Sequence, residues 1–258
     1  VNYINFLEVF GIDPSKASKR MGEIIALKKE ADAFAVPSYI VPHSVYSISK
    51  TLFEELSVII EDNDITSIHF LESAQEKTLL EHLDGELMSS YLRMGISKET
   101  VKESGTNHLY AFENYLPRKG NLILVHNTFA DTDIISRIQD RPDVYWCLCP
   151  NSNIYIEDSL PPVADLIGKS ATIVLGTDSL ASNSSLNLLE ELKTLQKHFP
   201  AIELPELITW ATRNGALALK LSEMGTIERG KTPGLVLIEN CDLAGLKLTD
   251  KSFSRRLI

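Results

Sequence analysis

The stretch "SIHFLESAQE", residues Ser67 to Glu76, decides the fold. It ends a short apolar run with a histidine, His69, and places a glutamate, Glu72, three residues later. Residues three apart face opposite sides of a strand but the same side of a helix. If the strand ends near Phe70, Glu72 lies on a loop or on the first turn of the next helix, where it can fold back over His69. The stretch therefore predicts a strand whose carboxyl end carries polar side chains.

The order of a strand followed by a helix repeats along most of the chain. The predicted strands are "YINFLEVF" (3–10), "SYIVPHS" (38–44), "TSIHF" (66–70), "NLILVHN" (121–127), "DVYWCLCP" (143–150) and "ATIVLGTD" (171–178). Each precedes a helical stretch, which makes six β–α units. The runs are mostly continuously apolar, as expected for parallel strands that are covered on both faces. The tail "GTIERGKTPGLVLIEN" (225–240) contains a strand with no helix after it and resembles a piece of a small appended β-structure.

Two architectures accommodate six parallel strands: a doubly wound open sheet, and most of an eight-stranded (β/α)8 TIM-type barrel. The open sheet is expected to bind phosphate at a glycine-rich turn, but the sequence contains no G-x-G-x-x-G and no Walker pattern. A barrel is expected to carry its chemistry at the carboxyl ends of several strands.

Polar residues occupy four of the predicted strand ends. His43, His69, His126 and Asp178 each lie at the carboxyl end of a strand. Taken singly, such a histidine can be a core residue, Asp178 can be a helix N-cap, and Glu72 can complement a helix dipole. Together, neutral imidazoles and a carboxylate are the ligands that suit Zn²⁺ or Fe²⁺. The pattern therefore predicts a catalytic metal site, with Glu72 placed for acid–base work.

The other histidines and the cysteines carry weaker signals. His82, His108 and His198 fall in helical or loop stretches, and we expect them to be ordinary surface residues. Cys147 and Cys149 share one face of a predicted strand, where small buried side chains are expected rather than a metal pair. Three cysteines are too few for a disulfide framework, which indicates a reducing cytoplasm.

The composition excludes several classes of partner. The formal net charge of −10 repels nucleic acid and anionic membrane surfaces. No run approaches the roughly 18 apolar residues of a membrane span. The start, "VNYINFLEVFG", lacks the cationic region and cleavage site of a signal peptide. We therefore expect a cytoplasmic protein whose partner is a small molecule.

Several segments together resemble the amidohydrolase superfamily, in its cytosine deaminase/chlorohydrolase branch. They are "VPHSVYSIS", "SIHFLES", "LVHNTF", "CPNSNIYIEDSLPPVADL", "VLGTDSLASN", "LLEELKTL", "ATRNGALALKL" and "GTIERGKTPGLVLIE". The resemblance implies a TIM-type barrel that is incomplete here, with strands three to eight over residues 1–222. Residues 223–258 would then be a C-terminal piece of the small β-sandwich domain that flanks the barrel.

The resemblance also implies the catalytic roles. His69 would be a metal ligand from the fifth strand, and Asp178 on the eighth strand would bind the metal and act as base for the nucleophilic water. Glu72 would carry protons to the leaving amine. His126 on the sixth strand would polarise the substrate or stabilise the tetrahedral intermediate.

Further residues are implied to shape the substrate pocket. His43 would line it together with His126, while Ser179 and Asn183 would orient Asp178 or its loop. No lysine replaces His43 at the fourth strand, so a single divalent ion is expected, with zinc favoured and iron as the alternative.

One departure from the family pattern is large. The family takes two more metal ligands from a His-x-His motif after the first strand, and this sequence contains no His-x-His. Its first predicted strand, residues 3–10, resembles the third strand of the family. Loss of two strands would leave bare strand edges and an open interior. We therefore expect weak metal binding and inactivity in the isolated chain, and either a homo-oligomer or association with a separate N-terminal segment.

The activity implied by the resemblance is hydrolytic deamination of an amino-substituted heterocycle, a purine or pyrimidine base or nucleoside derivative, by a metal-activated water. Chlorohydrolase and cyclic-amide hydrolase activities belong to the same branch and stay open. A third alternative is a non-catalytic barrel fragment that acts as an interaction subunit.

Overall fold

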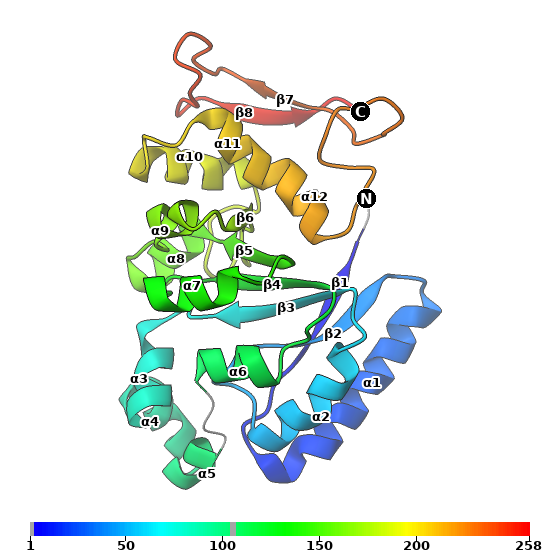
Figure 1. The fold of residues 1–258 in the computed structure, drawn as a ribbon, viewed down its shortest axis with the longest axis vertical. Helices are drawn as coiled ribbons and strands as arrows, with labels where there is room; N and C mark the ends of the chain where they lie inside the picture. The colour runs from blue at the N-terminus through cyan, green and yellow to red at the C-terminus, as the bar shows by residue number, and fades with distance from the viewer. Residues whose placement is uncertain (1–2, 104–106) are drawn as a thin grey trace. The chain divides into compact units, whose positions relative to one another are not determined.

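The structure, a computed structural model, describes residues 3–103 and 107–258. Parallel strands alternate with helices along the chain (Figure 1), which confirms the predicted α/β class. The chain divides into two compact units, Val1–Val144 and Tyr145–Ile258. The predicted boundary after residue 222 lies inside the second unit and stays a prediction. In the described part of the chain, no helix is both long enough and apolar enough to cross a membrane.

The first unit contains four strands that run in the same direction. They are β1 (Asn5–Val9), β2 (Ser38–Pro42), β3 (Ile65–Phe70) and β4 (Asn121–His126). β1 pairs with β2, and β3 pairs with β4, both in parallel. A parallel bridge between Ser44 and His69 links the two pairs, and the His69 N–H donates to the His43 carbonyl at 2.9 Å. The carboxyl ends of these strands therefore lie at one edge.

Helices follow each strand of the first unit. They are α1 (Ala17–Ala33), α2 (Lys50–Ile60), α3 (Ala74–His82), α4 (Gly85–Arg93), α5 (Lys98–Glu103), α6 (His108–Asn114) and α7 (Thr132–Gln139), with a 3-10 turn at Pro14–Lys16. In α2, the Ser49 hydroxyl caps the helix by accepting from the Leu52 N–H. Leu52, Phe53, Leu56 and Ile60 recur at helical spacing and are fully buried. Each such side chain contributes about 1.5–3 kcal/mol by leaving water.

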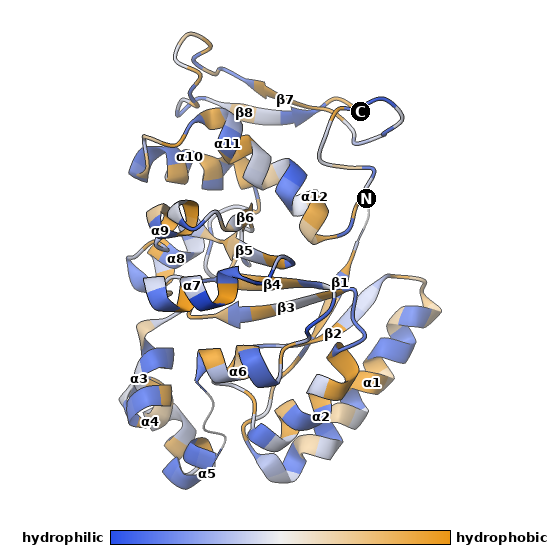
Figure 2. Cartoon of the chain, in the orientation of Figure 1, coloured by the Kyte–Doolittle hydropathy of each residue, from blue (hydrophilic) through white to orange (hydrophobic). Residues whose placement is uncertain are grey.

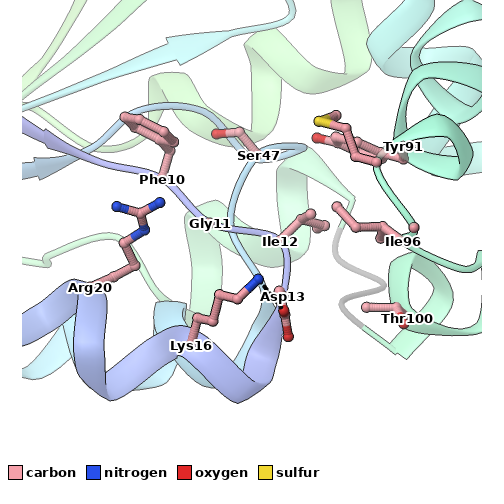
Figure 3. A pocket seen from close by; sticks show the side chains of 12 residues that line it. Phe10, Gly11, Ile12, Asp13, Lys16, Arg20, Ser47, Tyr91, Ile96 and Thr100 are labelled. Carbon is pink, nitrogen blue, oxygen red and sulfur yellow. Dashed lines mark ion pairs between the residues drawn. The ribbon is translucent and has the colours of Figure 1, made fainter.

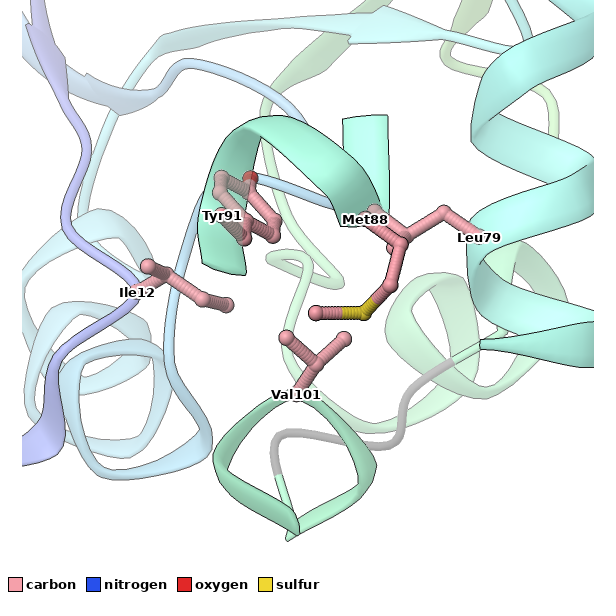
Figure 4. Close-up of a cluster of buried hydrophobic side chains, with 5 residues drawn as sticks. All are labelled: Ile12, Leu79, Met88, Tyr91 and Val101. Carbon is pink, nitrogen blue, oxygen red and sulfur yellow. The ribbon is translucent and has the colours of Figure 1, made fainter. Parts of the chain in front are cut away.

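A separate apolar cluster anchors the helices between β3 and β4. It contains Ile12, Leu79, Met88, Tyr91 and Val101 (Figure 4). Leu79 comes from α3, Met88 and Tyr91 from α4, and Val101 from α5. The cluster packs these helices against the segment that follows β1. Side-chain packing therefore holds the carboxyl end of β1 in place.

The second unit repeats the strand–helix order and ends in a hairpin. Its elements are β5 (Val144–Leu148), α8 (Pro150–Glu157), α9 (Val163–Gly168), β6 (Thr172–Leu175), α10 (Leu188–His198), α11 (Leu204–Thr209), a π-helical turn at Trp210–Asn214, α12 (Gly215–Ala218), β7 (Val236–Glu239) and β8 (Phe253–Arg256). β5 and β6 are parallel, whereas β7 and β8 are antiparallel. α10 is amphipathic (Figure 2), with Leu189, Leu192 and Leu195 buried. The strand β7 was predicted within the tail of residues 225–240, whereas β8 was not predicted.

Candidate active site

Three imidazole rings form a row at the carboxyl ends of β2, β3 and β4. The His43 and His69 ring centroids lie 4.9 Å apart, and the His69 and His126 centroids lie 5.5 Å apart. His126 is buried, while His43 and His69 are partly exposed. Burial, and secondarily the neighbouring His69, lowers the pKa of His43 from 6.5 to about 4, so His43 is neutral at pH 7. The first unit therefore brings all three predicted histidines together.

Glu72 lies on a turn that directs its carboxylate toward His126. The preceding Leu71 takes a left-handed backbone with φ 50°, which ends β3 and reverses the chain. The Glu76 carboxylate accepts from the N–H groups of Glu72 at 2.9 Å and Ser73 at 3.2 Å. Glu72 Oε1 lies 3.4 Å from His126 Nε2. The hydrogen bonds to Glu76 thus fix the main chain of the loop in which Glu72 was expected.

His108 is buried, which corrects its expected place on the surface. Its Nε2 lies 2.9 Å from Glu76 Oε2, and Glu76 itself is fully buried. The Phe70 ring packs edge-on against the imidazole, with centroids 5.0 Å apart. No local sequence pattern predicts this contact, because Glu76 lies 32 residues away from His108. His82 and His198 are exposed, as expected.

The end of β4 is held in an unusual backbone. His126 and Asn127 have φ values of 75° and 60°, a region that non-glycine residues seldom adopt. The Asn127 N–H donates to the Phe70 carbonyl at 2.9 Å, and its side-chain amide donates to the Leu124 carbonyl at 2.8 Å. Such strain costs about 1–3 kcal/mol per residue and occurs often at functional sites.

In the second unit, Asp178 follows β6 and is held by a set of short contacts. Its carboxylate accepts from the Ser152 hydroxyl and the Ser179 N–H, each at 2.7 Å, and from the Ser182 hydroxyl. Ser179 therefore contributes its main chain, while its exposed side chain accepts from the Ala181 N–H at 3.2 Å. Ser152 and Ser182 had not been singled out in the sequence, because serines in a loop have many uses.

Asn183 is buried and ties the same loop to α10. Its amide donates to the Thr177 carbonyl at 2.6 Å and to Glu191 Oε1 at 2.7 Å. Glu191 also accepts from the Asn151 N–H at 2.9 Å. Burial raises the pKa of Glu191, against the opposing effect of these hydrogen bonds. Glu191 therefore supports the loop that carries Asp178, a role that the sequence did not indicate.

The available side chains have the donor chemistry that a divalent metal requires. Within the first unit, one ligand atom each from Glu8, His43 and His69 lies within 4.8 Å of the other two. Imidazole nitrogens with carboxylate oxygens are typical ligands of zinc and iron. The first-unit residues therefore fit a divalent ion. Asp178 offers a further carboxylate in the second unit.

The first unit also contains a pocket of about 570 Å³ (Figure 3), and two of its lining residues, Phe10 and Ser47, contact His43. Its lining includes Phe10, Ile12, Arg20, Ser47, Tyr91 and Ile96. The Phe10 ring also packs edge-on against His43, with centroids 6.0 Å apart. Volumes of 300–1,000 Å³ are usual for small-molecule sites. The pocket and the histidines therefore share one wall.

The sequence of this chain is similar to the sequences of known proteins. The sequence profile of the amidohydrolase family matches residues 10–254. "Adenosine deaminase" of Helicobacter pylori is 28% identical over 244 residues, covering 91% of this chain and 58% of the relative. "5-methylthioadenosine/S-adenosylhomocysteine deaminase" of Halalkalibacterium halodurans is 32% identical over 150 residues, covering 55% of this chain and 34% of the relative. The chain spans about half the length of the curated relatives it matches.

Solved structures agree on the fold. Helicobacter pylori aminofutalosine deaminase superposes with a TM-score of 0.75 at 24% identity, covering 91% of this chain and 59% of that chain. Atrazine chlorohydrolase from Arthrobacter aurescens, complexed with zinc, gives a TM-score of 0.54 at 24% identity, covering 76% of this chain and 41% of that chain. These likenesses and the matching profile confirm the resemblance seen in the sequence: the chain belongs to the amidohydrolase family.

Proposed function

We propose that this chain carries the catalytic residues of a metal-dependent hydrolase that removes the amino group of an amino-substituted heterocycle, with adenosine-type nucleosides as the favoured substrates. The curated relatives are named as deaminases of adenosine, 5'-deoxyadenosine and 5-methylthioadenosine. The observation that carries the proposal is the Glu72 carboxylate, which lies 3.4 Å from His126 Nε2, and the His126 ring stacks on the His69 ring with centroids 5.5 Å apart. A partly exposed acid beside a row of imidazoles suits proton transfer.

His69 and Asp178 are the proposed metal ligands. When bound, a divalent ion lowers the pKa of water and polarises the bond under attack. We favour zinc over iron, because imidazole and carboxylate donors suit it and family structures hold it. The same ligands bind the ion weakly when they act alone, because a catalytic zinc site uses about three protein ligands.

The remaining residues move protons and hold the substrate. Glu72 passes a proton to the leaving amine, and the hydrogen bonds from its main chain to Glu76 keep it in place. His126 binds the oxygen that becomes negatively charged during attack. The Asp178 carboxylate accepts the proton released by the attacking water, with Ser179 and Asn183 fixing its loop.

The substrate is proposed to occupy the pocket between Phe10 and Tyr91. His43 contacts two residues of the pocket lining, Phe10 and Ser47. Apolar and aromatic side chains suit a flat base, and Arg20 lies over the Phe10 ring at 5.8 Å. The protein is proposed to work in the cytoplasm on free small molecules.

The test is a substrate panel on the full-length gene product loaded with zinc. We expect ammonia release from adenosine, 5'-deoxyadenosine or 5-methylthioadenosine, and no chloride release from chlorinated triazines. Glu72→Gln is expected to lower kcat by at least about 100-fold, the usual contribution of a general acid. Its zinc content, measured by mass spectrometry, should be unchanged. Full turnover by this variant would remove Glu72 from the mechanism.

A further inference from the structure

One buried histidine contacts the turn that carries Glu72 on both of its sides. The ring of His108 packs edge-on against Phe70, the last residue of β3, with centroids 5.0 Å apart. On the other side of the turn, His108 Nε2 lies 2.9 Å from Oε2 of Glu76 on α3. We propose that His108 is a positioning residue for the reaction, because it holds both flanks of the turn and thereby the Glu72 carboxylate. This inference rests on the proposed role of Glu72 as the proton carrier.

The two oxygens of the Glu76 carboxylate have different contacts. Oε1 accepts from the N–H groups of Glu72 at 2.9 Å and Ser73 at 3.2 Å. The Ser73 hydroxyl in turn accepts from the Glu76 N–H at 3.2 Å, which completes a capping box at the start of α3. The capping box uses only Oε1. The contact of Oε2 with His108 therefore adds a second anchor, which fixes the rotation of the carboxylate group.

The first residue of the turn is held independently of His108. Leu71 takes a left-handed backbone with φ 50°, a conformation that costs free energy for a residue with a side chain. Its carbonyl accepts from the Phe129 N–H at 3.0 Å, which ties the start of the turn to the segment after β4. The end of the turn is held by Glu76, and Glu76 is held by His108. A change at His108 is therefore expected to move the turn at the Glu72 end.

Burial makes this support hard to replace. Glu76 is fully buried and His108 is buried, so water does not readily take the place of either partner. The Glu72 carboxylate is partly exposed and lies 3.4 Å from His126 Nε2. The proposed proton carrier thus lies at the solvent side of the site while its support lies in the interior. A misplacement of about 1 Å in a reacting group can lower turnover by about 100-fold, even when the altered residue lies far from the chemistry.

The support is separate from the groups proposed to bind the substrate and the metal. In the described part of the chain, neither Glu76 nor His108 lines the pocket proposed for the substrate. Neither belongs to the groups of described side chains that could hold a metal ion. A change at His108 is therefore expected to lower kcat while KM and the zinc content stay as in the parent protein.

The experiment is steady-state measurement of ammonia release by the full-length gene product loaded with zinc. His108→Phe keeps an aromatic ring against Phe70 but has no ring nitrogen to contact Glu76, and we expect it to lower kcat by about tenfold to 100-fold. Glu76→Ala removes both anchors and should lower kcat at least as much. Glu76→Gln should keep most of the turnover, because its amide oxygen can still accept from the Glu72 N–H while its amide N–H faces His108.

A double variant distinguishes positioning of Glu72 from general damage to the fold. Glu72→Gln removes the acid, so addition of His108→Phe to it should cause no further loss of kcat if His108 acts through Glu72. Leu56→Ala is the matched control, because Leu56 is fully buried on α2 and its truncation destabilises the core away from the turn. We expect Leu56→Ala to unfold at a lower urea concentration and to keep the kcat of the parent protein. Circular dichroism checks that each variant is folded.

Two results would overturn the inference. One is a parent-like kcat in both His108→Phe and Glu76→Ala. The other is a loss from His108→Phe that is equally large in the Glu72→Gln background, since such a loss does not pass through the acid. If His108→Phe does not fold, the same test is made by comparing Glu76→Ala with Glu76→Gln, and equal kcat values of these two would contradict the inference. A lowered kcat in Glu72→Gln together with a parent-like His108→Phe would refute the positioning role alone and leave the proposed function standing.

Discussion

At the scale of single residues, Glu76 does more for the candidate site than its sequence position suggests. One carboxylate oxygen holds the Glu72 main chain, and the other holds His108. The sequence indicated Glu72 because an acid three residues after His69 stands out. It did not indicate His108, because a contact between segments this far apart leaves no local pattern.

His108→Ala should destabilise the protein strongly. The variant leaves the fully buried Glu76 carboxyl group without its contact to His108 Nε2 at 2.9 Å, and leaving a buried polar group without its hydrogen-bond partner costs about 1–3 kcal/mol. Urea unfolding followed by circular dichroism measures the loss. His82→Ala is the control, because His82 is exposed and should change the free energy of unfolding by about 0.5 kcal/mol or less. Equal stability of the two variants would contradict this role for His108.

At the scale of elements, strands were predicted well and turns were not. Long apolar runs fix the order β2 to β6, because these runs are largely buried, whereas β1 buries only its last residue, Val9. Leu71, His126 and Asn127 take left-handed backbones at the strand ends, although none is a glycine. Tertiary hydrogen bonds impose these conformations, so residue type alone does not reveal them.

One helix end offers a gain in stability. Asp158 is the exposed C-cap of α8, with φ 47°, and its carboxylate sits at the negative end of the helix dipole. Asp158→Gly removes both the strained backbone and the unfavourable charge, and should raise the free energy of unfolding by about 1 kcal/mol. Asp158→Asn removes only the charge and should give a smaller gain. A lower thermal midpoint for Asp158→Gly would refute the argument.

At the scale of the whole molecule, the sequence matches only about half the length of its relatives. The hairpin of β7 and β8 forms a two-stranded sheet in the described part of the chain, and β7 exposes Val236 at 64%. Free strand edges with apolar side chains favour association. This hairpin is therefore a physical reason to expect an oligomer.

Sedimentation velocity tests this expectation. The parent chain should form dimers or larger species at micromolar concentration, and Val236→Lys should shift the distribution toward the monomer, because a charge on an edge strand opposes strand pairing. Val58→Lys is the matched control. Val58 is 74% exposed, but it lies on the helix α2 and not at the edge of a sheet. A monomeric parent, or an equal shift in both variants, would count against the hairpin.

The hydrogen bond between Glu76 and His108 has a consequence for how the pocket can change. α4, α5 and the turn between them lie between these two residues in the chain, and this stretch supplies Tyr91, Ile96 and Thr100 to the pocket wall. The pair anchors that stretch at both ends, close to Glu72. Sequence changes between the two anchors can therefore reshape the pocket wall while Glu72 stays where it is.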